Sequence, residues 1–114
     1  MKRNYWMFIN DILENIELIE KSTSKISKTE FEENKDIIDA TLRRLEIIGE
    51  ASKNLPSSLT KKYSEIPWKD IAGFRDIMIH AYFIVDIDKV WEVVRKDIPD
   101  LKKKISEIKK EKIE

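Results

Sequence analysis

Apolar residues recur at helical spacing along most of this chain, and no other feature constrains its fold as strongly. The first predicted helix runs from about Asn4 to Lys21, and its apolar face consists of Tyr5, Phe8, Ile9, Ile12, Leu13, Ile16 and Ile19. The second predicted helix runs from Thr29 to about Asn54, and its apolar face includes Ile38, Leu42, Leu45 and Ile48. The pattern Thr29-x-x-Glu32 predicts a capping box at the start of this second helix.

The second half of the chain predicts further helices. Residues 57–63 are expected to form a short helical turn, and a third long helix runs from Trp68 toward His80. Asp86 caps a fourth helix, which Pro99 is expected to kink or split. The apolar face of this fourth helix consists of Ile87, Val90, Val94, Leu101, Ile105 and Ile108.

The composition agrees with a helical fold. The 114 residues include only 2 glycines and 3 prolines, whereas 39% are charged, which favours long, solvated helices over turns and strands. A chain of this length has room for one hydrophobic core. We therefore predict an all-α protein with a single domain over residues 1–114, folded as an up-and-down bundle of four to five helices.

Charge and cysteine content exclude several classes of protein. The 22 basic and 22 acidic residues give a net charge of zero, which argues against a nucleic-acid binder held by a wide electrostatic footprint, so any RNA contact must be local. The absence of cysteine rules out disulfides and thiol chemistry, and with a single histidine it argues against a protein-only transition-metal site. The first helix is amphipathic rather than a signal peptide or a membrane span, so a cytoplasmic protein is expected.

Two other groups of residues are expected to have structural roles. The lysines between residues 102 and 110 are interleaved with glutamate, which is typical of a solvated helix face rather than of an RNA-binding surface. Trp6, Trp68 and Trp91 are expected in the core or in a subunit interface rather than as base-stacking surfaces.

The only histidine, His80, lies in a segment that also carries Arg75, Asp76 and Tyr82. On a continuous helix from Trp68, Arg75 falls on the apolar face, where an unpaired guanidinium is costly to bury. It is therefore either a structural ion-pair partner or a ligand for a phosphate. His80 is either a cap for the carboxyl end of the helix or an acid–base group, since imidazole titrates near about pH 6.5. Asp76 lies four residues before His80 and either orients its ring or forms an exposed helix pair with it.

Helix geometry limits how Arg75 and His80 act together. Five positions along an ideal helix turn about 500°, so the two side chains would point about 140° apart. Either the helix ends or unwinds near Ile79, or two subunits contribute residues to one shared cleft.

The residues of this segment resemble a known family. Arg75, His80 and Tyr82 match the Arg-x4-His-x-Tyr signature of the HepT-type HEPN proteins, the toxins of nucleotidyltransferase–HEPN toxin–antitoxin pairs. Four other stretches are also similar to that family, namely residues 41–51, 66–73, 90–91 and 97–99. Together with the motif, these stretches extend from residue 41 to residue 99 in the family's order.

The resemblance implies a homodimeric helical endoribonuclease that uses no metal or cofactor. In such a protein His80 would act as base or acid, Arg75 would stabilise the transition state, and the two motifs would face each other across the dimer. Asp76 would be a supporting residue, at a position where the family commonly carries asparagine. The resemblance also implies a nucleotidyltransferase antitoxin of the MNT type, which silences the toxin by transferring AMP to the motif tyrosine, here Tyr82.

A second hypothesis belongs to a different class of function. The chain could form a catalytically inert helical dimer that binds a nucleotidyltransferase or a nucleotide, with Arg75 and His80 as phosphate ligands.

Overall fold

The structure is a computed structural model, and it describes residues 4–74 and 86–113. Every regular element in these two ranges is a helix, so the predicted all-α class is confirmed. The elements are α1 (Tyr5–Thr23), α2 (Lys28–Glu33), α3 (Lys35–Lys53), α4 (Ser57–Lys62), α5 (Trp68–Ala72), α7 (Ile87–Glu92), a π-helical segment η1 (Val93–Asp97) and α8 (Ile98–Ile113).

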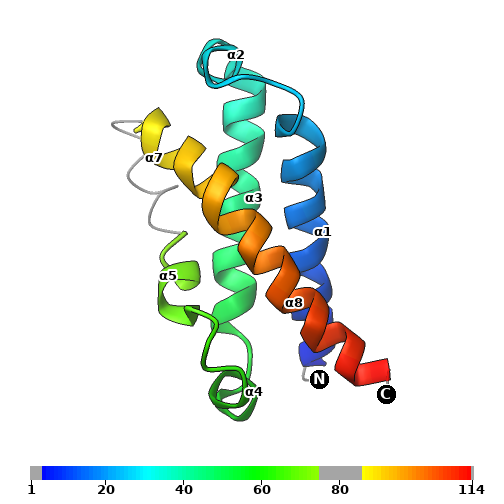
Figure 1. The fold of residues 1–114 in the computed structure, drawn as a ribbon. Coiled ribbons are helices and arrows are strands. Elements are labelled where there is room, and N and C mark those ends of the chain that lie inside the picture. The colour runs from blue at the N-terminus through cyan, green and yellow to red at the C-terminus, as the bar shows by residue number, and fades with distance from the viewer. Residues whose placement is uncertain (1–3, 75–85, 114) are drawn as a thin grey trace.

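The long helices form an up-and-down bundle. Helices α1 and α3 run antiparallel side by side, and α8 crosses them and packs against α1 (Figure 1). Short helices lie at the two ends of this bundle, with α2 at one end and α4 at the other. The first residues of α1 and the last residues of α8 lie together at the α4 end.

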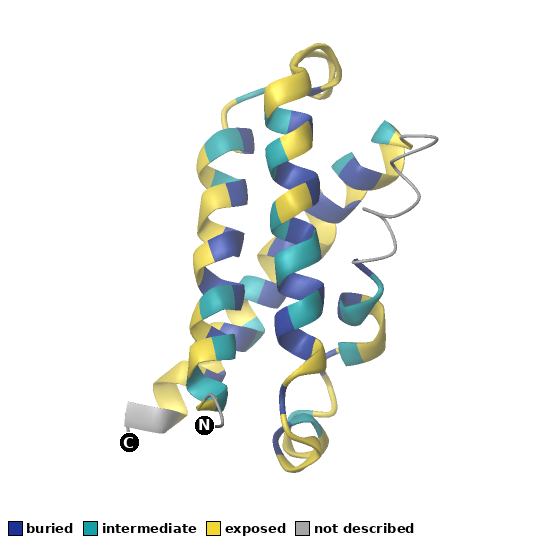
Figure 2. Cartoon of the chain, turned by 180° about the vertical axis from the view of Figure 1, so that it is seen from behind, coloured by how far each residue is buried: buried dark blue, intermediate teal, exposed yellow. Residues whose placement is uncertain are grey.

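The predicted apolar faces form the core. Every core residue predicted for α3 is buried, and so is every one predicted for α1 except Tyr5 and Phe8, which are partly buried at the α4 end. The fourth predicted face is likewise buried apart from the partly exposed Ile87. Figure 2 shows buried residues recurring along the inner side of each long helix. Burying one such side chain contributes about 1.5–3 kcal/mol, so this periodicity specifies the bundle.

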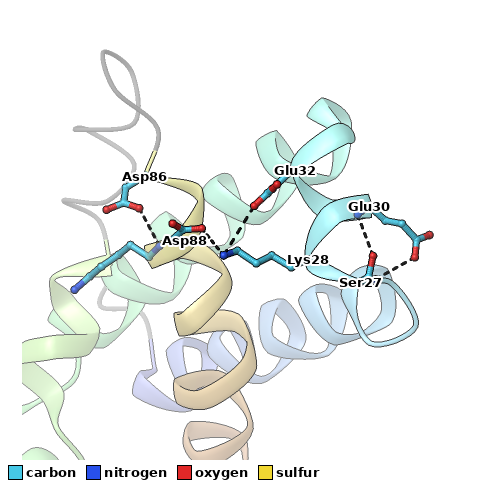
Figure 3. A network of polar contacts seen from close by, with 7 residues as sticks. Ser27, Lys28, Glu30, Glu32, Asp86 and Asp88 are labelled. Atoms are coloured by element: carbon cyan, nitrogen blue, oxygen red, sulfur yellow. Dashed lines mark hydrogen bonds and ion pairs between the residues drawn. The ribbon is translucent and has the colours of Figure 1, made fainter.

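The second predicted helix is divided in two, and its predicted start at Thr29 is wrong. The capping box is formed by Ser27 and Glu30: the Ser27 hydroxyl accepts from the Glu30 N–H at 3.1 Å, and the Glu30 carboxylate accepts from the Ser27 N–H at 3.2 Å (Figure 3). Helix α2 then ends at Glu33, and the side chain of the next residue, Asn34, accepts from the Ile37 N–H at 3.1 Å and caps α3. The Ser27-x-x-Glu30 pattern prevails because the turn it begins buries Phe31 completely.

The third predicted helix is interrupted near its start. Helix α5 ends at Ala72, and the Gly73 N–H donates to the carbonyl of Lys69 in a closing turn. A Cβ atom at position 73 would approach the Asp70 carbonyl oxygen to 3.1 Å, so glycine suits this turn. The predicted helix from Trp68 is therefore interrupted by a turn at Gly73, and Phe74 is helical again. The rest of that predicted helix lies outside the described residues.

The fourth predicted helix is confirmed in its start, whereas Pro99 follows a widened turn and does not split the helix. The Asp86 carboxylate accepts from the Lys89 N–H at 3.1 Å and caps α7. Before Pro99 the helix widens into η1, where the Ile98 N–H donates to the carbonyl of Val93, five residues back. Proline lacks an N–H and clashes with the carbonyl four residues earlier, and a wider turn relieves both problems. The helix thus passes through Pro99 without ending.

None of the helices within residues 4–74 and 86–113 combines the length and the apolar character needed to span a bilayer.

Candidate active site

The four residues predicted to carry the chemistry, Arg75, Asp76, His80 and Tyr82, lie outside the described residues. Their predicted roles, and the two alternative ways of bringing Arg75 and His80 together, therefore remain predictions. The structure describes the two flanks of this segment: α5 with Phe74 on one side and α7 on the other.

The first flank is fixed by the core and by an indole hydrogen bond. Phe74, the last described residue before the motif, is buried, as is Ile71 one turn earlier. Helix α5 packs against α3. At the start of α5, the Trp68 indole N–H donates to the Tyr63 carbonyl at 3.0 Å. The chain therefore enters the motif from an anchored position.

The second flank is tied to α2 by polar contacts. The Lys28 ammonium lies 2.5 Å from the Asp88 carboxylate and 4.0 Å from that of Glu32 (Figure 3). The hydrogen bond to Asp88 is the main cause of the raised pKa of Lys28. Both side chains of the Lys28–Asp88 pair are well exposed, so this ion pair contributes little to global stability. The pair joins the first turn of α7 to α2.

A buried contact reinforces this connection between α2 and α7. The rings of Phe31 and Trp91 pack with centroids 5.0 Å apart, and the Arg95 guanidinium lies 4.2 Å above the Trp91 ring. Arg95 also donates to the carbonyls of Thr23 and Ile26, at 2.8 and 2.6 Å, after the end of α1. The chain leaving the motif is therefore held by α1 and α2 together.

Carboxylates surround the hollow next to Phe74. This hollow of about 90 Å³ is bordered by Asp70, Asp97 and Asp100, with Lys104 paired to Asp100 at 2.9 Å. Burial raises the pKa of Asp97, and the charge of Glu92 raises it further. Three carboxylates against one ammonium repel phosphate, so this side of the flank is unsuited to the RNA backbone.

Within residues 4–74 and 86–113, no group of three or more histidine, cysteine, aspartate or glutamate side chains could hold a metal ion.

Sequence reasoning missed the residues that hold the second flank. Trp91 and Arg95 are four residues apart on a predicted helix, a spacing that places side chains together and could have suggested their contact. The Lys28–Asp88 pair joins residues far apart in the chain, and no local pattern announces it.

Comparison with known proteins places the chain among ribonucleases. A family model described as "Ribonuclease HepT-like" matches residues 12–108. A Methanocaldococcus jannaschii protein named "Gamma-glutamylcyclotransferase and putative RNase" is 50% identical over 111 residues, which is 97% of this chain and 50% of that protein. The "Probable ribonuclease HepT" of Thermococcus cleftensis is 46% identical over 110 residues, 96% of this chain and 100% of that protein. The chain thus spans half the length of the first relative and all of the second. No solved structure matches.

Proposed function

The chain belongs to the HepT-like ribonuclease family, and from this premise we propose that it is a metal-independent endoribonuclease that acts as the toxin of a toxin–antitoxin pair. The observation that carries the proposal is the family match over residues 12–108, a range that contains the whole Arg-x4-His-x-Tyr motif. The anchoring of α5 and α7 supports it, because a catalytic segment needs fixed ends.

The proposed reaction is transfer of the scissile phosphate to the neighbouring ribose. His80 takes the proton of the 2′-hydroxyl, whose oxygen attacks the phosphorus while the bond from phosphorus to the 5′-oxygen breaks. The leaving 5′-oxygen takes up a proton, and the products are a 2′,3′-cyclic phosphate and a 5′-hydroxyl. Arg75 stabilises the charge on the phosphate oxygens, and Asp76 orients the imidazole.

The acting unit in this proposal is a homodimer. One imidazole cannot be base and acid at the same instant, so two facing motifs would supply one histidine to each role. A shared cleft also removes the difficulty that Arg75 and His80 would diverge by about 140° on one helix.

Control would come from a nucleotidyltransferase antitoxin that adenylylates Tyr82. The added AMP would place an anion next to Arg75, where it competes with the scissile phosphate for the guanidinium. Inhibition would then be both electrostatic and steric.

Cleavage of single-stranded RNA by the purified protein tests the catalytic roles. Arg75→Ala and His80→Ala should each lower the cleavage rate by about 10²–10⁴-fold while leaving helicity and melting temperature unchanged. The matched control is Lys103→Ala, which removes a cation from an exposed position of α8. A fully active single mutant would remove that residue from the mechanism.

Mixing the two inactive variants tests the shared cleft. If each cleft draws its arginine and its histidine from different subunits, heterodimers of Arg75→Ala with His80→Ala should recover part of the activity. A mixture without activity would place both residues in one subunit.

Incubation with the nucleotidyltransferase and ATP tests the proposed control. Adenylyl groups should appear on the peptide that contains Tyr82, with loss of cleavage, and Tyr82→Phe should take up none. Modification of Tyr5 or Tyr63 instead would refute the assignment. A wild-type protein that binds the transferase but never cleaves RNA would favour the inert dimer.

A further inference from the structure

A hollow at the α4 end of the bundle has the lining of a small-ligand site. It has a volume of about 310 Å³ and lies among α1, α4 and α8, at the end where α1 begins and α8 ends (Figure 1). Ligand sites commonly have volumes of about 300–1,000 Å³. This hollow is separate from the acidic one beside Phe74, with which it shares no lining residue.

Aromatic rings form one side of the hollow. Tyr5 and Trp6 are both partly exposed, and their ring centroids are 4.7 Å apart with an angle of 34° between the planes. Tyr63, from the end of α4, lines the same hollow, and the Lys62 ammonium lies 5.4 Å from the centroid of its ring. Tyr5 and Trp6 therefore give this hollow an aromatic wall on which a planar ligand can stack.

The polar groups of the hollow select an uncharged ligand. The charged side chains that line it are Lys62 and Glu111, which lie 3.8 Å apart and cancel each other. Lys62 and the Tyr63 hydroxyl both contact the Oε2 atom of Glu111. Within the described residues no hydrogen bond or ion pair involves Oε1 of Glu111, so this atom can accept a hydrogen bond from a ligand.

The hollow is close in the chain to the predicted catalytic segment. The Tyr63 backbone carbonyl accepts from the indole of Trp68, the first residue of α5. Helix α5 has five residues and so spans only about 7.5 Å before Gly73 and Phe74. A strand of RNA whose phosphate is at the motif could therefore place a base a few nucleotides away in the hollow.

We propose that this hollow binds an unpaired nucleobase of the RNA substrate, a subsite that rests on the proposed ribonuclease function. The base stacks on Tyr5 and Trp6, and an exocyclic amino group donates to Oε1 of Glu111. Adenine, cytosine and guanine carry such an amino group and uracil does not, so uracil is disfavoured here. Trp6, expected from the sequence to be a core or interface residue, is thereby assigned a substrate contact.

Binding of an uncleavable RNA tests the subsite without relying on catalysis. The probe is a short single-stranded oligonucleotide with 2′-O-methyl riboses and a 2-aminopurine base placed at successive positions. At one position the 2-aminopurine fluorescence should be quenched on binding, and Trp6→Ala should restore it and weaken binding by about 5- to 150-fold, the effect of losing one stacked base. Met7→Ala is the matched control, since it truncates an exposed neighbour that does not line the hollow.

A second variant covers the case in which Trp6→Ala perturbs the fold. Glu111 is exposed on α8, and Glu111→Ala should remain folded by circular dichroism, with a small fall in melting temperature from the lost Tyr63 hydrogen bond, but should abolish the preference for an amino-bearing base over uracil at the quenched position. No quenching at any position, together with unchanged affinity in both variants, would overturn the subsite. If the wild-type protein still cleaves RNA in that case, the subsite is refuted while the proposed ribonuclease function is retained. Quenching that depends on Trp6 in a protein that cleaves nothing would support the subsite and refute the ribonuclease.

Discussion

Two buried threonines provide a matched test of what an unpaired hydroxyl costs in this core. Thr41 on α3 and Thr23 on α1 are 0% and 1% exposed. The Thr23 hydroxyl donates to the Ile19 carbonyl at 2.7 Å. The Thr41 hydroxyl has no hydrogen-bond partner among the described residues. Valine has nearly the same shape as threonine and a similar helix propensity, so Thr→Val at each site changes mainly the hydroxyl.

The two substitutions should change stability in opposite directions. A buried hydroxyl without a partner costs about 1–3 kcal/mol in proteins, so Thr41→Val should raise the free energy of unfolding by about 1–2 kcal/mol. Thr23→Val removes a satisfied hydroxyl and should lower it by about 0.5–1.5 kcal/mol. In a domain of this size 1 kcal/mol corresponds to roughly 4 °C in melting temperature, so the two variants should differ by roughly 6–14 °C.

Urea and thermal unfolding followed by circular dichroism measure both effects. The denaturant m-value should be the same in both variants, since neither substitution changes the surface exposed on unfolding. If Thr41→Val destabilised the protein as much as Thr23→Val does, its hydroxyl would have a partner, and the reasoning would be refuted.

Three further outcomes are expected. Burial and the charge of Glu92 raise the pKa of Asp97 above 3.8, so the Asp97 carboxyl binds its proton more tightly in the folded state than in the unfolded state. The free energy of unfolding therefore falls as the pH rises from 3.8 through that raised pKa. Asp97→Asn should therefore stabilise the protein against urea near neutral pH but not well below pH 3.8. The hydrogen bond to Glu111 raises the pKa of Tyr63 from 10.0 to about 12, so its contribution to stability is complete below pH 10 and is lost as the pH rises to 12. Ultraviolet titration of Glu111→Gln should show the pKa of Tyr63 falling toward 10.0. Arg95→Lys should lower the melting temperature by roughly 4 °C, because an ammonium cannot stack on the indole and reach both carbonyls at once.

Most of the fold could be predicted because local periodicity and burial agree. The apolar faces of α1, α3 and α8 were visible as residues three and four apart, and the core forms where those faces meet. The start of α2 was misplaced because two overlapping patterns, Ser27-x-x-Glu30 and Thr29-x-x-Glu32, compete for the same capping role. Which pattern prevails depends on the burial of Phe31, a tertiary effect.

The candidate site could be predicted only as far as its motif. Arg75, Asp76, His80 and Tyr82 were identified by spacing and resemblance, and their geometry stays a prediction. The contacts that hold the neighbouring parts of the structure join residues far apart in the chain, such as Tyr63 with Glu111 or Arg95 with the end of α1. Such contacts appear only after the helices have packed, so no local pattern in the chain encodes them.

The meeting of α1 and α8 at the α4 end has a consequence for protein architecture. Tyr5 and Glu111 line one hollow, so any domain joined to either end of the bundle would be attached at its rim. A fused neighbour would then act as a wall of that hollow and restrict which ligands enter it. Fusion would thereby change the shape of the hollow without altering a residue of the bundle. Because the first residues of α1 and the last residues of α8 lie at the same end of the bundle, circular permutants opened between α1 and α2 should fold.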